Sequence, residues 1–552
     1  MKIDCLLVHT PKIHNFYKLI GSHMYCMLMP MGLFAIGDMV AKEGLRVQIM
    51  HLGVEKIEDP MFSFKDYLRL VRPKVVGLSL HWHLQSYDVI QLAKEAKSFS
   101  PDIFVVLGGF TASYFHREIM DEFSCVDAII RGDGEVPFLE LSREVAIRGR
   151  DLSKVPNLTW RDEGETRANR INYVAKDEDL SNLNFTNMEL LKNYPAYRDI
   201  STLRPYWING LSKMSNLALC YPKYKAFPIS ISRGCPVNCT YCGGGSDAQE
   251  LINGRRGIAV RSVEKVVGSI KEVRRYGYDT IHINYLPFGG KPYYFQELFY
   301  AIKDEGIKIN CIMECWSLPP KEVIAAYKKT FTDHRFSIII SPESASENTR
   351  KACKGFYFSN EELFEFLTFT KEAEISVSLF FNIGLPGETL GDFKRTSDFQ
   401  RKLVNRFGRH VSCQTATAEI DPASPACNNP GKFGITRPSL SFQDYFNTHS
   451  LRNNSPFSAY RIACCTRANN KILKSERMNI DLSKKQIQGI VCNEFCPLSN
   501  LICVKFRINN LVFARKAINL LSRVCCNAAF LYWKLRSLIT KCNNKHSNLI
   551  QA

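Results

Sequence analysis

The chain has 552 residues, of which 45% are hydrophobic and 23% are charged. This length and composition fit several globular domains and exclude collagen-like, low-complexity and wholly disordered proteins. The formal net charge is +18, but nine positive charges and no Asp or Glu lie between Phe495 and Ala552, so the rest of the chain is only moderately basic.

The start of the chain and its cysteines bear on the cellular compartment. Asp4 lies close to the N-terminus and no stretch approaches about 18 uninterrupted apolar residues, so we expect neither a signal peptide nor a membrane span. The expected location is the cytoplasm. In a reducing compartment, twenty cysteines are not a disulfide framework and are expected to include a metal or redox site.

Residues 1–147 are predicted to form a doubly wound, Rossmann-like α/β domain. Short apolar runs alternate with helical patterns, which is typical of a parallel sheet with crossover helices. The predicted strands are 3–8, 45–50, 75–80, 103–107 and 128–130, and the predicted helices are 32–42, 87–98 and 114–122. In such a sheet the ligand lies beyond the carboxyl ends of the strands.

The carboxyl ends of these strands do not carry a dinucleotide fingerprint. No G-x-G-x-x-G follows the first strand, which disfavours a nicotinamide or flavin dinucleotide. The third strand ends in His81-Trp82-His83, and we interpret its two histidines as surface residues of a loop rather than as ligands.

A polar, weakly periodic stretch over 148–225 is predicted to be a linker with small strands. From 226 to 420 a second alternating pattern predicts a partial (β/α)6 barrel, whose chemistry belongs at the carboxyl ends of its strands. The predicted strands are 229–233, 280–284, 308–312, 336–340, 377–383 and 411–415, with helices over 262–276, 321–329, 360–372 and 389–403.

A cysteine loop directly after the first barrel strand carries the strongest signal. Cys235, Cys239 and Cys242 supply three thiolates from one loop, and thiolates are the soft ligands that iron-sulfur clusters and zinc select. Structural zinc needs a fourth protein ligand, and no Cys or His stands nearby in the sequence to provide one. A cubane cluster with one open iron is the favoured interpretation, and buried core cysteines are disfavoured in a loop rich in Gly and Pro.

This loop resembles the radical SAM superfamily, whose C-x-x-x-C-x-x-C motif holds a 4Fe-4S cluster. The resemblance implies that the open iron binds S-adenosylmethionine and that reductive cleavage yields a 5'-deoxyadenosyl radical. Glu343 and Ser344 look like the family's ribose and methionine contact region. Asn382, Gly384 and Gly387 look like its glycine-rich turn on the adenine side.

The resemblance has one departure and implies one partner. Many family members have a carboxylate after the second barrel strand, where residues 284–290 of this chain read Asn-Tyr-Leu-Pro-Phe-Gly-Gly. The usual contact to the amino group of S-adenosylmethionine is therefore absent from that stretch. The implied partner is an external electron donor such as flavodoxin or ferredoxin.

A doubly wound domain ahead of such a barrel resembles the cobalamin-binding subgroup of the superfamily. Gly108, Gly109 and Thr111 on one turn, and Gly132 and Gly134 on another, look like its corrinoid-facing residues. The D-x-H-x-x-G motif that supplies a lower histidine ligand in other cobalamin proteins is absent from the chain. The resemblance therefore implies cobalamin without that ligand.

Residues 421–552 are predicted to be a mainly helical C-terminal extension. Its cysteines at 464, 465, 492, 496 and 503 are irregularly spaced, which favours structural thiols over an auxiliary cluster. Residues 511–539 show the spacing of a basic amphipathic helix. We favour a helix docked on its own barrel over a peripheral contact with an anionic membrane, and both over nucleic-acid binding, because no nucleic-acid-reading module accompanies the charge.

The function implied is that of a cobalamin-dependent radical SAM methyltransferase acting on an unactivated carbon of a small molecule or natural product. A radical SAM cyclase, or an enzyme of another rearrangement without methyl transfer, is the alternative of the same class. A first domain that binds substrate or a partner instead of cobalamin is a second alternative. A noncatalytic scaffold that binds metal or associates with membranes is the alternative of another class.

Overall fold

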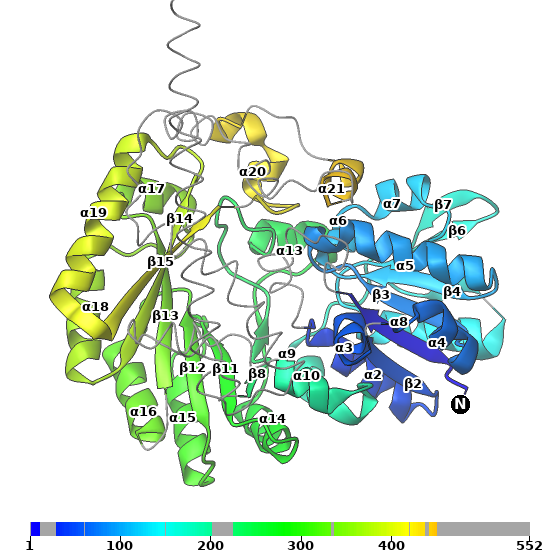
Figure 1. Ribbon diagram of the computed structural model, residues 1–552, viewed down its shortest axis with the longest axis horizontal. Coiled ribbons are helices and arrows are strands. Elements are labelled where there is room, and N and C mark those ends of the chain that lie inside the picture. The colour runs from blue at the N-terminus through cyan, green and yellow to red at the C-terminus, as the bar shows by residue number, and fades with distance from the viewer. Residues whose placement is uncertain are drawn as a thin grey trace, which may run out of the picture.

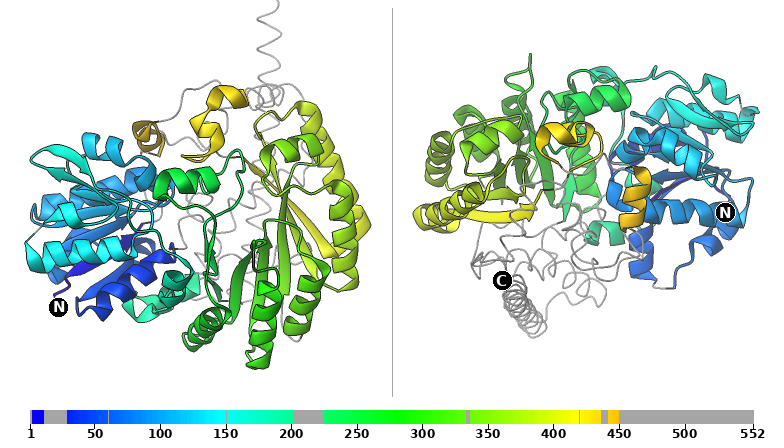
Figure 2. Two further views of the ribbon diagram at one scale, coloured as in Figure 1. Left: turned by 180° about the vertical axis from the view of Figure 1, so that it is seen from behind. Right: turned by 90° about the horizontal axis from the view of Figure 1, so that it is seen from above.

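The computed structural model describes most of the chain up to residue 449. The described residues are 2–10, 29–59, 61–149, 151–200, 225–332, 336–418, 420–435 and 441–449. Two parallel sheets, each flanked by helices, stand next to each other, as Figures 1 and 2 show. The amphipathic pattern over 511–539 and the cysteines from 464 to 503 lie outside the described residues.

The first sheet has the strand order of a doubly wound fold. Its five parallel strands lie in the order β2-β1-β3-β4-β5, which confirms the predicted fold class. They are β1 (Cys5–His9), β2 (Val47–His51), β3 (Val75–Ser79), β4 (Phe104–Gly108) and β5 (Ala128–Ile130). The small strands predicted beyond residue 147 are β6 (Leu158–Asp162) and β7 (Glu165–Ala168), and they extend this sheet in antiparallel orientation.

Alternation along the strands explains why this sheet is covered on both faces. In β1, Cys5 and Leu7 point into one apolar cluster, while Leu6 and Val8 point into another. Helices α2 (Gly32–Lys42) and α8 (Glu135–Arg143) cover the first face, and α4 (Phe64–Val71), α5 (Ser86–Phe99) and α7 (His116–Glu122) cover the second. The shorter helices are α3 (Leu52–Glu58), α6 (Phe110–Tyr114), α9 (Asp177–Asn182) and α10 (Tyr194–Ile200).

The second sheet has six parallel strands in the order β15-β14-β13-β12-β11-β8, as predicted for a partial barrel. The strands are β8 (Ala226–Pro228), β11 (Thr280–Tyr285), β12 (Asn310–Cys315), β13 (Phe336–Glu343), β14 (Ser376–Ile383) and β15 (Val411–Thr417). The helices beside them are α14 (Val263–Arg275), α15 (Tyr294–Asp304), α16 (Lys321–Phe331), α17 (Glu347–Cys353), α18 (Asn360–Glu372) and α19 (Leu390–Phe407). Helices α15 and α17 were not predicted.

The first barrel strand differs from its prediction over 229–233. Strand β8 already ends at Pro228, and residues Ser232–Arg233 form a separate strand, β9, paired antiparallel with β10 (Ala259–Val260). The guanidinium of Arg233 on β9 reaches carboxylates of the first domain rather than the barrel.

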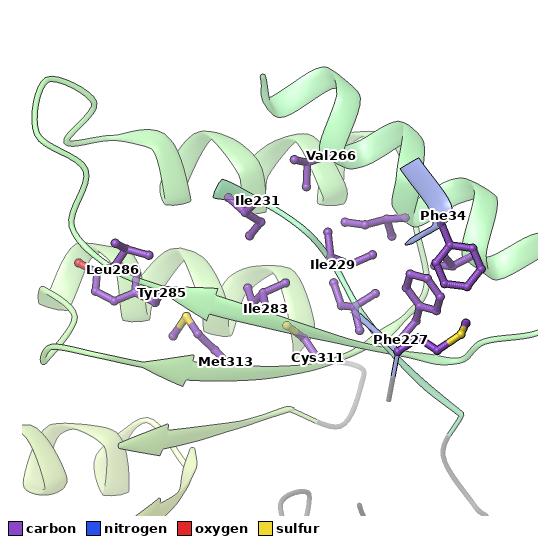
Figure 3. Packing of buried hydrophobic residues seen from close by; sticks show 14 of the residues in the cluster. Phe34, Phe227, Ile229, Ile231, Val266, Ile283, Tyr285, Leu286, Cys311 and Met313 are labelled. Atoms are coloured by element: carbon purple, nitrogen blue, oxygen red, sulfur yellow. The ribbon is translucent and has the colours of Figure 1, made fainter. Parts of the chain in front are cut away.

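The two sheets share one continuous hydrophobic core. Phe34 on α2 lies beside Phe227 on β8, with ring centroids 6.4 Å apart. Figure 3 shows this contact together with Ile229, Ile231 and Val266 of the barrel side. The barrel is therefore attached to the first domain by apolar packing as well as by the chain itself.

The chain returns to the first domain after the barrel. Helix α20 (Pro425–Asn428) is followed by α21 (Phe442–His449), which packs on α5, with Phe442 and Tyr445 buried in the second apolar cluster of the first domain. None of the described helices is both long enough and apolar enough to cross a membrane.

Candidate functional site

The cysteine loop lies between β9 and α13 (Ser246–Asn253), where the two domains meet. Helix α13 packs against α6 of the first domain, as Figure 1 shows. Cys235, Cys239 and Cys242 are half-buried free thiols. The loop therefore presents three potential ligands beside both domains.

Backbone contacts from distant segments fix the course of this loop. The N–H of Thr240 donates to the carbonyl of Cys353, at 2.9 Å, and the N–H of Ala426 donates to the carbonyl of Thr240, at 2.8 Å. The N–H of Gly243 donates to the Asp421 carboxylate, at 3.1 Å. The loop is thus held by the segment after α17 and by the segment after β15.

Two sulfur atoms also accept hydrogen bonds from backbone amides. The Gly355 N–H lies 3.3 Å from Sγ of Cys239, and the Gly244 N–H lies 3.4 Å from Sγ of Cys242. Burial, aided by the Asp421 charge, raises the pKa of the Cys242 thiol to about 12. Burial also raises the pKa of Cys235. A bound cation is therefore needed to hold these sulfurs as thiolates, and metals do this.

Three thiols on one loop are the donor set of an iron-sulfur cluster. Within the described ranges, no three His, Cys, Asp or Glu side chains surround a point where one metal ion could bind. In a 4Fe-4S cluster each thiolate binds a different iron, so its ligands need not converge on one point. Three free thiols on one loop, with amides directed at the sulfurs, fit that group.

Glu343 lies at the carboxyl end of β13 in an unusual backbone conformation. Its φ is +66°, in the left-handed region, and the pairing of β13 with β14 shifts register just before it. The side chain is buried, accepts a hydrogen bond from the Asn382 amide, and lies 3.7 Å from Nζ of Lys354. A strained, buried carboxylate of this kind is typical of a functional site. The structure thus brings together Glu343 and Asn382, two of the predicted site residues.

Sequence reasoning missed Lys354 and Tyr241. Lys354 is buried directly after α17, and Tyr241 stands between two of the cysteines with its pKa raised well above its usual range by burial and by the charge of Glu343. The position of Tyr241 inside the cysteine motif is a sequence signal that could have identified it. No sequence signal placed Lys354, because only the fold brings α17 beside the cysteine loop.

The other predicted contacts to S-adenosylmethionine have structural roles in the folded chain. The Ser344 hydroxyl is fully buried and lies 3.2 Å from the Thr396 hydroxyl. Gly384 and Gly387 have positive φ in the turn after β14. The Gly384 N–H donates to the buried Glu388 carboxylate, at 2.5 Å. A cofactor contact of Ser344 or of this turn stays a prediction.

In the first domain, Gly108, Gly109 and Thr111 lie at the carboxyl edge of the sheet. The strand order reverses between β1 and β3, which is where ligands of doubly wound folds bind. Gly108 ends β4, and the Thr111 hydroxyl donates to the carbonyl of His81, at 3.1 Å. The residues that follow β1, from 11 to 28, lie outside the described ranges.

Gly132 and Gly134 follow β5 at the same carboxyl edge, where the Gly132 N–H donates to the Ser113 hydroxyl, at 3.0 Å. A Cβ on Gly132 would stand 2.2 Å from Cβ of Asn253 at the end of α13, and one on Gly134 would stand 3.2 Å from Ile36. These two glycines thus pack against protein, and their contact with cobalamin stays a prediction.

Histidines at this edge are held by protein contacts. His81 packs edge-on against Trp82 and Phe110, and burial lowers its pKa to about 4, so its imidazole is neutral at neutral pH. His83 is buried, with its ring beside that of Tyr445, so the prediction that it is a surface residue of a loop is wrong. The cause is that α21, far along the chain, packs over it. His81 and His83 are thus both engaged by neighbouring aromatic side chains.

Comparison with known families agrees with this two-domain arrangement. Residues 17–142 match the B12 binding domain, and residues 229–399 match the radical SAM superfamily. The chain therefore carries a B12-binding domain followed by a radical SAM domain.

Curated relatives of similar length are methyltransferases by name. An uncharacterized methyltransferase of Pyrococcus horikoshii is 25% identical over 411 residues, which cover 73% of this chain and 78% of that protein. The hopanoid C-3 methylase of Methylococcus capsulatus is 25% identical over 391 residues, covering 69% of this chain and 64% of that protein.

Solved structures share the fold at low sequence identity. The radical S-adenosylmethionine methyltransferase TsrM of Kitasatospora setae, with tryptophan substrate and a SAM analogue bound, has a TM-score of 0.58 at 14% identity, covering 79% of this chain and 77% of that chain. The cobalamin-dependent S-adenosylmethionine radical enzyme OxsB, with aqua-cobalamin bound, has a TM-score of 0.57 at 14% identity. The match covers 100% of this chain and 81% of that chain.

Proposed function

We propose that this chain is a cobalamin-dependent radical SAM enzyme that cleaves S-adenosylmethionine reductively and methylates an unactivated carbon of a small molecule. The observation that carries the proposal is the position of the three free thiols, on a loop beside both the barrel and the B12-binding domain. Relatives that cover about two thirds or more of this chain and are named methyltransferases or a methylase support methyl transfer.

The three cysteines bind the cluster in this proposal. Cys235, Cys239 and Cys242 are the iron ligands, and the amides of Gly244 and Gly355 stabilise negative charge on two of the sulfurs. When bound, the cluster supplies one electron at a time and cobalamin supplies a transferable methyl group. The residues of the chain contribute ligation, orientation and exclusion of water.

S-adenosylmethionine binds at the carboxyl ends of β13 and β14. Glu343 and Asn382 face each other there, and Lys354 orients the Glu343 carboxylate through its charge. Ser344 and the turn at Gly384 and Gly387 complete this site. The buried pair of Glu343 and Lys354 lies close to the cysteine loop, since the Lys354 charge acts on Cys235.

Cobalamin binds at the carboxyl edge of the first sheet in this proposal. Gly108, Gly109 and Thr111 approach the corrinoid there, and no histidine supplies a lower ligand. Gly132 and Gly134, which follow β5 at the same edge, contact it as well in this proposal; Gly132 also packs against Asn253 of α13, and Gly134 packs against Ile36 of α2.

The proposal extends to partners and location. An external one-electron donor such as flavodoxin or ferredoxin reduces the cluster, and the substrate is a small molecule or natural product. The protein works in the cytoplasm, where its many thiols stay reduced. A peripheral membrane contact would involve the basic tail, which lies outside the described residues.

One comparison favours a second candidate function. Over 183 residues, 32% of this chain, the sequence is 28% identical to the anaerobic magnesium-protoporphyrin IX monomethyl ester cyclase of Rubrivivax gelatinosus. A cyclase or another radical enzyme without methyl transfer would use the same cysteine loop and the same site for S-adenosylmethionine.

The proposal is tested by substituting one ligand and one matched cysteine. The full chain is purified without oxygen from cobalamin-supplied cells, and iron, sulfide and cobalt per chain are measured together with 5'-deoxyadenosine formed under reduction. Cys239→Ala is expected to lose most of the iron and all 5'-deoxyadenosine formation. Cys125→Ala, a half-buried cysteine of the first domain, is expected to behave as the wild type.

The metal content separates the candidate functions. About four irons and one cobalt per chain support the proposal. Four irons without cobalt, even after loading with hydroxocobalamin, would move the function to radical chemistry without methyl transfer. Undiminished 5'-deoxyadenosine formation by Cys239→Ala would refute the assignment of the cluster ligands.

A further inference from the structure

Four charged side chains form a buried cluster where the two domains meet. Arg233 bridges Asp133 and Glu135, with NH1 2.9 Å from Oδ1 of Asp133 and NH2 2.6 Å from Oε1 of Glu135. Its NH1 also donates to the second oxygen of Glu135, at 3.1 Å. Arg255 pairs with the other oxygen of Asp133. Two positive and two negative charges are thus enclosed together.

The members of this cluster come from both domains. Asp133 and Glu135 belong to the loop between β5 and the start of α8, whereas Arg233 is on β9 and Arg255 follows α13. The Asp133, Glu135 and Arg255 side chains are at most 4% exposed, and that of Arg233 is 21% exposed. Water therefore competes little with these ion pairs.

The same loop of the first domain contacts both ends of the cysteine loop. Arg233 stands two residues before Cys235. Asn253, at the end of the helix that follows the cysteine loop, lies so close to Gly132 that a Cβ there would stand 2.2 Å away. The segment that contains all three cysteines is therefore anchored at its entrance and at its exit on residues 131–135.

Stability alone does not explain such a cluster. Removing charges from water costs free energy, and well-packed apolar residues often replace buried ion pairs without loss of stability. An arginine that binds two carboxylates through a planar fork instead fixes distance and orientation. A geometric role fits a residue placed directly before three cluster ligands.

We propose that Arg233, held by Asp133 and Glu135, is a positioning residue that sets the separation between the cysteine loop and the B12-binding domain. This inference rests on the proposed function, because the separation matters once a cluster and a corrinoid are bound. Arg233 acts through the loop and contacts neither group. Asp133 and Glu135 follow β5 at the carboxyl edge of the first sheet, and in this inference they act by fixing the geometry between the two cofactors.

The test measures the distance between the two cofactors. The full chain is loaded with iron, sulfide and hydroxocobalamin, both metal centres are brought to their paramagnetic states, and the spin-spin interaction is measured by pulsed electron paramagnetic resonance. The wild type is expected to give one narrow distance. Arg233→Gln is expected to give a broader or shifted distribution, with Arg233→Lys intermediate because an ammonium cannot make the two-pronged contact.

A matched variant separates positioning from a structural role. Lys192 forms a comparable ion pair with the buried Glu55, and its side chain is 25% exposed. Lys192→Gln is expected to lower the thermal midpoint as Arg233→Gln does, while leaving the distance between the metal centres unchanged. A wild-type distance in Arg233→Gln would overturn the inference.

A second variant tests the inference if Arg233→Gln loses its cofactors. Should Arg233→Gln fail to retain iron and cobalt, Glu135→Gln removes one charge and keeps the shape of the contact. A shifted distance in that variant supports the inference, and an unchanged one overturns it. The proposed function is judged on the wild type alone: a wild type that binds neither cluster nor corrinoid would overturn it, and this inference with it.

Discussion

At the scale of single residues, buried charges mark the surroundings of the cysteine loop. Lys354 and Glu343 are buried together, and Arg233 is enclosed by two carboxylates. Glu388 is buried on the turn after β14, with one carboxylate oxygen bound to backbone amides and the other without a hydrogen-bond partner. Charged side chains are rarely buried without a partner, so each of these residues has a definable role.

Glu388 makes stability depend on pH. Burial raises its pKa from 4.5 to about 7, so the folded protein keeps a proton that the unfolded chain has released. Its stabilising contribution is complete below about pH 4.5 and is lost as the pH rises through 7, a change of roughly 3 kcal/mol. The free energy of unfolding of Glu388→Gln, relative to that of the wild type, should therefore increase when the pH is raised from 5 to 8.

The measurement is urea unfolding of the cluster-free protein at the two pH values. Glutamine has the same shape, accepts the same two amide hydrogen bonds and does not titrate, so the difference between variant and wild type isolates this carboxyl. An identical difference at pH 5 and pH 8 would show that Glu388 does not titrate in this range.

At the scale of elements, the cysteine loop depends on a close approach of two backbones. A Cβ on Gly243 would stand 2.2 Å from the carbonyl oxygen of Pro422, whereas one on Gly244 would meet only Sγ of Cys242, at 3.7 Å. The segment after β15 thus leaves no room for a side chain at Gly243. The two neighbouring glycines provide a matched pair of substitutions.

Gly243→Ala is expected to lower the iron retained per chain, because the loop must move away from Pro422 and carry Cys242 with it. Gly244→Ala is expected to retain iron as the wild type does, since its new methyl group makes an ordinary contact and its amide hydrogen bond to Cys242 remains. Iron analysis and circular dichroism of both variants provide the comparison. Equal iron in the two variants would contradict the predicted role of this contact.

At the scale of the whole molecule, the two domains are expected to unfold as coupled units because they share a core. Phe34 and Phe227 come from different domains, and their rings pack with an interplanar angle of 50°. Replacing either by alanine should cost about 3–5 kcal/mol of stability. The double variant should show a coupling energy of about 1 kcal/mol, as expected for an aromatic pair.

Urea unfolding of the four proteins of this double-mutant cycle gives the coupling energy. The control cycle combines Phe34 with Phe331, which is buried at the end of α16 and does not share the contact. Its two substitutions should add without coupling. If the effects of the Phe34 and Phe227 substitutions on the free energy of unfolding were also additive, this contact would not couple the stabilities of the two domains.

Sequence patterns alone were sufficient to predict the fold class, the family and the order of the two domains. Local signals carry these features: alternating apolar runs predict the parallel sheets, and three cysteines at fixed spacing in one loop need no tertiary knowledge to be recognised. Strands β14 and β15 begin within a residue of their predicted starts, because buried strands of parallel sheets are continuous apolar runs.

The distant residues that surround the cysteine loop became known from the folded chain and not from the sequence. Lys354, Asp421 and the loop at Asp133 are far from Cys235 in sequence, and no local pattern predicts that they approach it. The same reason explains why the close approach of Asn253 to Gly132 was not predicted. A glycine-rich turn is a local signal, whereas the surface that fills the space beside it depends on how the two domains pack.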